Sequence, residues 1–147
     1  MSATHVNLPS DETYDAAVLA NPAPSVGHLL RERIAATPDR AAYSYPEGVA
    51  WGEMTWAQLG DRVWRLAAGL EDLGVEAEER VAIACSTRIE WVLGDLAIMA
   101  AGAATTTIYP TTIADDVAYI LDNSGSVVVI AEDAEQAHKL REVREVI

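Results

Sequence analysis

The chain has 147 residues, of which 50% are hydrophobic and 22% are charged, a composition that supports one compact domain with its own core. Its net charge of −13 disfavours direct binding to nucleic-acid phosphates or to anionic lipid. The single cysteine excludes an internal disulfide, and no apolar run approaches the roughly 20 residues that span a bilayer. The first residues lack the basic start and apolar core of a signal peptide, so we expect a cytoplasmic location.

The N-terminal part of the chain predicts an arm, a helix and a hairpin. Residues 1–25 are polar, contain proline and lack periodicity, which is typical of an extended arm. The next stretch predicts a helix that stops at Pro38, and its apolar side chains recur at helical spacing: Val26, Leu29, Leu30 and Ile34. Two short strands around Pro46-Glu47-Gly48 then predict a β-hairpin.

The stretch from Thr55 to Gly74 is the clearest helix of the sequence. Thr55 is placed to cap it, Gln58 completes a capping box, and Gly74 suits a left-handed exit. One apolar stripe predicts its buried face: Trp56, Leu59, Val63, Leu66, Leu70 and Leu73. Because the chain has no phenylalanine, we expect its four tryptophans to provide most of the large aromatic burial: Trp51, Trp56, Trp64 and Trp91.

The rest of the chain alternates strands with helices three times. Short apolar or β-branched runs predict strands at 80–85, 103–109 and 127–131, and apolar periodicity predicts helices at 88–100, 113–123 and 134–145. The strand at 103–109 is expected to be central. The helix 88–100 is apolar nearly all round, so we expect it to be deeply buried. Three βα units predict an α/β fold with a partial, doubly wound parallel sheet.

Small polar residues mark the ends of these predicted helices. Thr87 with Glu90, and Thr112 with Asp115, have the spacing of capping boxes. Asp133 is placed to start the last helix. Gly102 lies where a helix must turn into a strand, so we expect it to have a positive φ.

Three predicted strand ends lie where parallel sheets bind ligands: Cys85–Thr87, Tyr109–Thr112 and Glu132-Asp133. The residues offer little chemistry beyond this position. Cys85 is interpreted as a small buried hydrophobe, and Lys139 as a member of a surface ion pair. No metal site or catalytic triad is predicted, and the chain has no Gly-x-Gly, so neither a dinucleotide fingerprint nor a Walker loop is possible.

The order of these segments resembles the N-terminal region of the AMP-forming acyl-CoA synthetases, in the adenylate-forming superfamily. The likeness runs from about Val26 to the end of the chain, through "MTWAQLGDRVWRLAAGLEDLGV", "ERVAIACSTRIEWVLGDLAIMAAGA", "TTTIYPTTIADDVAYILDNSG" and "VVVIAED". Met54–Leu59 is similar to the first core motif of the family, and Leu96–Pro110 to the second. Arg88–Trp91 and the turn Tyr109–Thr112 most resemble the long-chain fatty acyl branch.

The resemblance implies an enzyme that makes an acyl-adenylate from a fatty acid and ATP with Mg²⁺, and then transfers the acyl group to coenzyme A. The family's phosphate loop, adenine-binding segment, ribose-binding Asp and catalytic Lys all follow the region matched here. No catalytic residue is therefore assigned, and no cofactor is assigned to this chain alone. Residues 26–147 are expected to form a scaffold segment of the large domain, with Tyr109, Pro110 and Thr111 lining the acyl pocket.

Five further residues are expected to have structural roles: Thr55, Gly74, Thr87, Gly102 and Thr112. The implied partners are the remainder of a ligase or a second copy of the chain, and the intact enzyme is expected in the cytoplasm or peripheral to a membrane. The main alternative is a free-standing, non-catalytic module for protein contacts. A small-ligand binder that uses the three strand ends is a third hypothesis.

Overall fold

The computed structural model describes residue 20 and residues 22–144, so the arm predicted over residues 1–25 lies almost wholly outside it. The chain order is α2 (Val26–Ala36), β1 (Ala41–Glu47), β2 (Ala50–Thr55), α3 (Trp56–Asp72), β3 (Arg80–Ala84), α4 (Ile89–Ala100), β4 (Ala104–Ile108), α5 (Ala114–Ser124), β5 (Ser126–Ala131) and α6 (Ala134–Arg144). The three predicted βα units are confirmed, with every bound within one or two residues of its predicted place.

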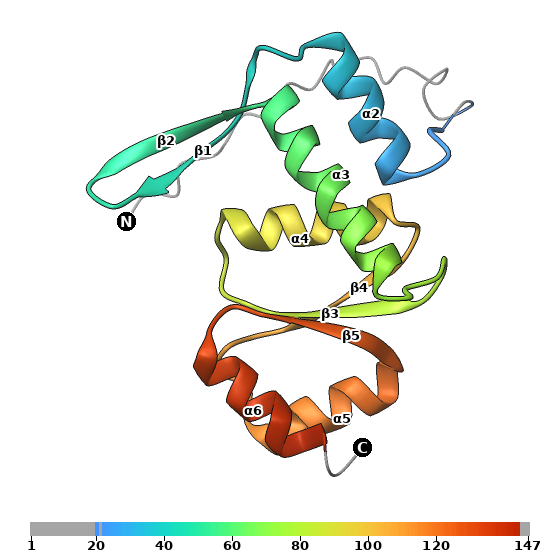
Figure 1. Cartoon of the computed structure of the whole chain (residues 1–147), viewed down its shortest axis with the longest axis vertical. Helices are drawn as coiled ribbons and strands as arrows, with labels where there is room; N and C mark the ends of the chain where they lie inside the picture. The colour runs from blue at the N-terminus through green and yellow to red at the C-terminus, as the bar shows by residue number, and fades with distance from the viewer. Residues whose placement is uncertain (1–19, 21, 145–147) are drawn as a thin grey trace, which may run out of the picture.

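The strands form two sheets. β1 and β2 pair antiparallel, while β4, β3 and β5 form a parallel sheet in that order. The central strand is therefore β3, and the prediction that 103–109 would be central is wrong. After β3 the chain adds β4 beside it on one side, then crosses back over β3 and adds β5 on its other side. Figure 1 shows α3 and α4 on one face of this sheet and α5 and α6 on the opposite face.

The apolar character of β3 follows from this central position. Val81, Ile83 and Cys85 face a cluster with α3 and α4, whereas Ala82 and Ala84 face a second cluster with α5 and α6. Every residue of β3 from Val81 to Ala84 is buried. A strand that is covered on both faces needs apolar residues throughout, which explains the uninterrupted run.

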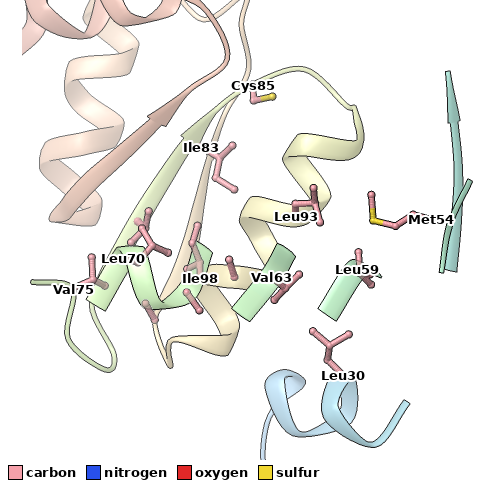
Figure 2. Packing of buried hydrophobic residues seen from close by; sticks show 14 residues of the cluster. Leu30, Met54, Leu59, Val63, Leu70, Val75, Ile83, Cys85, Leu93 and Ile98 are labelled. Carbon is pink, nitrogen blue, oxygen red and sulfur yellow. The ribbon is translucent and has the colours of Figure 1, made fainter. Parts of the chain in front are cut away.

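The larger cluster joins the helices above the sheet. Figure 2 shows Leu59 and Val63 of α3 between Leu30 of α2 and Leu93 and Ile98 of α4. α4 is buried at Leu93, Gly94, Ala97 and Ile98 and half-buried at its other residues from 91 to 100, so the predicted deep burial holds for one face of the helix.

The buried face of α3 differs from the predicted stripe at two positions. Leu66 is 45% exposed and Leu73 is 70% exposed. Gly60 and Ala67 are buried in their place, and Ile34 of α2 lies against Gly60. Because Gly60 has no side chain, α2 packs closely against α3 at this point, and Leu66 and Leu73 lie outside the buried face.

The hairpin β1–β2 projects from the body of the molecule (Figure 1). It turns at Gly48 and Val49, slightly after the predicted Pro46-Glu47-Gly48, because Pro46 still pairs with Trp51. No other layer of the described residues covers the hairpin tip, and Trp51 is 72% exposed. The expected aromatic burial therefore fails at Trp51, whereas Trp56, Trp64 and Trp91 are half-buried against a core of aliphatic residues.

The helix ends confirm some predicted signals and contradict others. Thr55 and Gln58 form the capping box, and Gly74 and Gly102 have φ of 90° and 80°. Thr87 does not cap α4, because the helix begins one residue later, with Arg88 as its N-cap; the Glu90 side chain binds the Arg88 guanidinium instead of a cap N–H. Thr112 does not cap α5, whose N-cap is Ile113. Thr112 instead closes a turn, donating its N–H to the Tyr109 carbonyl at 2.9 Å.

Candidate functional site

The carboxyl ends of β3 and β5 meet through one carboxylate. Glu132 follows β5, and its two oxygens accept hydrogen bonds from the Ser86 N–H at 2.6 Å and the Ser86 hydroxyl at 2.7 Å. Parallel neighbours end at the same edge of a sheet, so residues 46 apart in sequence come together here. The pair ties the first turn after β3 to the end of β5.

Arg88 extends this contact into a small charged network. Its guanidinium donates two bonds to Glu90, at 2.6 Å and 3.1 Å, and lies 3.3 Å from Glu132. Arg88 and Glu90 are about half exposed, while the Glu132 side chain is only 16% exposed. One cation therefore faces two carboxylates, and the network is acidic.

The network shifts the pKa values of its members. The Ser86 N–H, followed by the Ser86 hydroxyl, lowers the pKa of Glu132 because both bonds stabilise the carboxylate. The bond from Arg88 lowers the pKa of Glu90 in the same way. Both groups are thus ionised at neutral pH, and neither is prepared to act as a general acid.

The thiol of Cys85 lies beside this network and is unreactive in character. Burial, and then the negative charge of Glu132, raises the pKa of the Cys85 thiol. The residue is 6% exposed and contacts the Ser86 carbonyl at 3.3 Å. A buried thiol with a raised pKa makes a poor nucleophile, which supports the interpretation of Cys85 as a small core residue.

The tip of β4 is held by α6 and does not join the Glu132 network through any hydrogen bond found within residues 22–144. The Lys139 ammonium donates to the Pro110 carbonyl at 2.7 Å and to the Thr112 carbonyl at 2.9 Å. Gln136, which is buried, donates to the same Pro110 carbonyl at 3.3 Å. The prediction of a surface ion pair for Lys139 is therefore wrong: its ammonium group donates hydrogen bonds to turn carbonyls.

A hollow of about 320 Å³ opens between the ends of β3 and β5. Its lining residues are Ile83, Cys85, Arg88, Glu90, Ile130, Ala131 and Glu132. The predicted pocket residues of the β4 tip are absent from this lining. Tyr109 is 69% exposed and Thr111 is also exposed, so they face solvent in the described part of the chain.

Sequence reasoning missed the partners of Gln136 and Lys139. The two side chains are three residues apart on α6, but the carbonyls that they bind are 26 to 29 residues away. The only available signal was that Lys139 is the single lysine of the chain.

The described residues contain no group of three or more His, Cys, Asp or Glu side chains that is placed to hold a metal ion. None of their helices is long and apolar enough to cross a membrane.

The model of one enzyme family, the AMP-binding enzymes, matches residues 30–147. The chain is 35% identical over 119 residues to the long-chain-fatty-acid–CoA ligase FadD15 of Mycobacterium bovis. That match covers 81% of this chain and 20% of the ligase. The relatives thus include fatty acyl-CoA ligases, of which this chain spans about a fifth.

Two further relatives are from Mycobacterium tuberculosis. The solved N-terminal domain of FACL13 superimposes with a TM-score of 0.73 at 31% identity, covering 82% of this chain and 30% of that chain. An uncharacterized protein is 37% identical over 95 residues, covering 65% of this chain and 53% of that protein. The fold is therefore that of the N-terminal region of adenylate-forming enzymes.

Proposed function

This chain belongs to the family of AMP-binding enzymes, and we propose that it is the N-terminal scaffold segment of a long-chain fatty acid–CoA ligase. The segment supplies the first strands of the large domain and the helices on both faces of them. In the intact enzyme a fatty acid is adenylated with ATP and then joined to coenzyme A. The observation that carries the proposal is the 35% identity over 119 residues to a ligase of that class.

The donor groups at the ends of β3 and β5 do not fit a nucleoside triphosphate. Phosphates are bound by backbone N–H groups of glycine-rich loops and by cations, and the chain has no Gly-x-Gly. At the ends of β3 and β5 the Ser86 N–H is already taken by Glu132, and Arg88 is shared between two carboxylates. These carboxylates repel phosphate, so no catalytic step is assigned to this chain.

The turn after β4 is the part of the segment proposed to face the acyl group. Tyr109, Pro110 and Thr111 follow a strand of the parallel sheet at the edge where such sheets bind ligands. The exposed Tyr109 ring offers apolar area, and Lys139 fixes the backbone carbonyls behind it. This arrangement supports a role in lining a pocket that other parts of the ligase complete.

A chimeric ligase tests the proposal. Residues 30–147 replace the aligned segment of the Mycobacterium bovis ligase, and acyl-CoA formation is measured with a long-chain fatty acid, ATP, Mg²⁺ and coenzyme A. We expect activity from the chimera and none from a ligase that lacks the segment. A chimera that melts cooperatively but forms neither acyl-adenylate nor acyl-CoA would contradict the proposal.

The isolated chain provides the complementary measurement. We expect it to release no pyrophosphate and to form no acyl-adenylate above a heat-killed control, because positioning and electrostatic stabilisation of the phosphates supply most of the rate in such reactions. Pyrophosphate release that scales with the concentration of purified chain would overturn the assignment of a purely structural role.

A free-standing module for protein contacts is the second candidate, and one observation favours it. The uncharacterized Mycobacterium tuberculosis relative is matched over 53% of its length, so it is far shorter than a ligase. The coding sequence downstream of Ile147 separates the candidates. A reading frame that continues into a glycine-rich phosphate loop supports the ligase, whereas a stop codon followed by unrelated sequence supports the module.

A further inference from the structure

The turn after β4, Tyr109–Thr112, has one exposed face and one face that is held against α6. Its own hydrogen bond runs from the Thr112 N–H to the Tyr109 carbonyl at 2.9 Å. Tyr109 and Thr111 are exposed, whereas Pro110 and Thr112 are half-buried, and their carbonyls accept hydrogen bonds from α6. The exposed face is therefore free to meet a ligand while the other face fixes the backbone.

Lys139 uses its full hydrogen-bonding capacity on the held face of the turn. An ammonium group has three N–H donors. In Lys139 these lie 2.7 Å from the Pro110 carbonyl, 2.9 Å from the Thr112 carbonyl and 3.2 Å from the Gln136 side-chain oxygen. None of the ion pairs found within residues 22–144 includes Lys139. The ammonium group is thus placed by three neutral acceptors and not by an opposite charge.

Gln136 is the second side chain that holds the turn. It is 4% exposed, and its side-chain nitrogen donates to the Pro110 carbonyl at 3.3 Å, while its side-chain oxygen accepts from Lys139. Residues three apart on a helix lie on the same face, so both donors reach the turn from one side. The Pro110 carbonyl therefore accepts hydrogen bonds from two side chains of the same helical turn.

The helix that carries these two donors is itself anchored. At its start, the Asp133 carboxylate accepts a hydrogen bond from the Gln136 N–H at 2.9 Å, which caps the helix. Toward its other end, Leu140 and Val143 belong to the apolar cluster between the sheet, α5 and α6, and Val143 is 4% exposed. A helix that is fixed at both ends gives the turn a rigid support.

We propose that Gln136 and Lys139 are positioning residues for fatty-acid binding. They hold the turn after β4 in one conformation, in which Tyr109 and Thr111 face the acyl group. This inference rests on the proposed function, because the ligase assignment is what brings an acyl group to this turn. It makes the affinity for the fatty acid depend on two side chains of α6 that lie behind the turn.

Loss of these bonds should raise the KM for the fatty acid and leave kcat nearly unchanged. A ligand that binds one conformation has an apparent Kd equal to its intrinsic Kd divided by the fraction of that conformation. If Lys139→Met leaves the turn in its binding conformation about a tenth of the time, the KM of the chimeric ligase for a long-chain fatty acid rises about tenfold. The kcat and the KM for ATP should stay within about twofold. A role in stability alone would lower kcat through the amount of folded enzyme and would leave the KM unchanged.

Hydrogen exchange in the isolated chain provides a readout that does not depend on catalysis. The Thr112 amide makes the hydrogen bond of the turn, and the Gly125 amide makes the corresponding bond at the other end of α5. Both amides close short local structures, so each should exchange through its own local opening. We expect Lys139→Met to speed the exchange of the Thr112 amide about tenfold and to leave that of the Gly125 amide unchanged.

Two further variants complete the comparison. Arg141→Met is the matched control, because Arg141 lies at an exposed position of the same helix and does not bond to the turn. It should change neither readout. Gln136→Met keeps the length of the side chain and leaves the Pro110 carbonyl bonded to Lys139, so it is a milder change that preserves folding. It should shift both readouts in the same direction as Lys139→Met, by a smaller factor.

The outcomes separate this inference from the proposed function. A parent chimera that folds but lacks activity contradicts the ligase assignment. An active chimera in which Lys139→Met and Gln136→Met leave the KM for the fatty acid unchanged overturns the positioning role alone. Equal acceleration of the Thr112 and Gly125 amides would also overturn it, because it would show a general loss of stability instead of a loosened turn.

Discussion

Substituting Gly102 by valine should destabilise the chain through its backbone. Gly102 has a φ of 80°, in the left-handed region, between the end of α4 and the start of β4. Its carbonyl accepts a bond from the Glu78 N–H at 2.9 Å, so the peptide is held in place. A Cβ atom would lie 3.6 Å from the Ala77 Cβ, which is an ordinary contact. The expected cost is therefore conformational, about 1–3 kcal/mol.

Thermal melting followed by circular dichroism measures this cost. For a chain of this size, 1 kcal/mol corresponds to about 2–4 °C, so we expect a melting temperature lower by about 2–12 °C. Urea titration should show a lower midpoint with an unchanged slope.

Gly69→Ala is the control, because Gly69 is exposed in α3 and its added Cβ would meet nothing within 4 Å. Alanine there should stabilise the chain by up to about 1 kcal/mol. The two substitutions are thus expected to have opposite signs. A Gly102→Val variant that melts within about 2 °C of the parent would refute the reasoning, since it would show that the exit from α4 does not require a left-handed residue.

The three βα units could be predicted because their signals are local. Apolar runs of five or six residues, helical periodicity and glycine exits each act over one or two turns of chain. The capping box of Thr55 and Gln58 is of this kind, and it is present as predicted. The boxes expected at Thr87 and Thr112 are absent because each helix begins one residue later than predicted; Glu90 binds Arg88, and Thr112 closes a turn.

The strand order could not be read from the chain in the same way. β3 pairs with β4 and with β5, and which strand lies in the middle depends on the direction of each crossover. The wholly apolar run of β3 was the available signal, since β4 contains three threonines. Burial of both faces explains that difference between the two strands.

The candidate site was predicted only as a location. The strand ends were expected to lie at one edge, and Ser86 and Glu132 do meet there. Their bond joins residues 46 apart, and the bonds of Lys139 reach residues 27 and 29 away. Such pairings depend on the register of the strands and on the position of α6 against the turn after β4. Composition and periodicity do not predict either of these.

Three further predictions concern α6, the acidic network and the surface charge. Lys139→Met should lower the free energy of unfolding by about 1.5–3 kcal/mol, because it leaves the Pro110 and Thr112 carbonyls without a charged donor. Arg141→Met, at an exposed position of the same helix, should lower it by less than about 0.5 kcal/mol. Urea titration measures both changes. The pKa of Glu132 in the folded chain is below its ordinary 4.5, so the contribution of the ionised carboxylate to folding stability is present above 4.5 and is lost as the pH falls through the folded pKa. Glu132→Gln should therefore flatten the loss of stability between about pH 5 and about pH 3. An unchanged dependence of stability on pH in this range would count against the network. The net charge of −13 should keep copies apart at low salt despite the open edge of β5. Because the Debye length falls from about 10 Å at 0.1 M to about 3 Å at 1 M salt, sedimentation should show monomers at low salt and association at 1 M sodium chloride. Monomers at both salt concentrations, melting cooperatively above about 60 °C, would instead indicate a complete and self-sufficient domain, and would favour the free-standing module over the ligase segment.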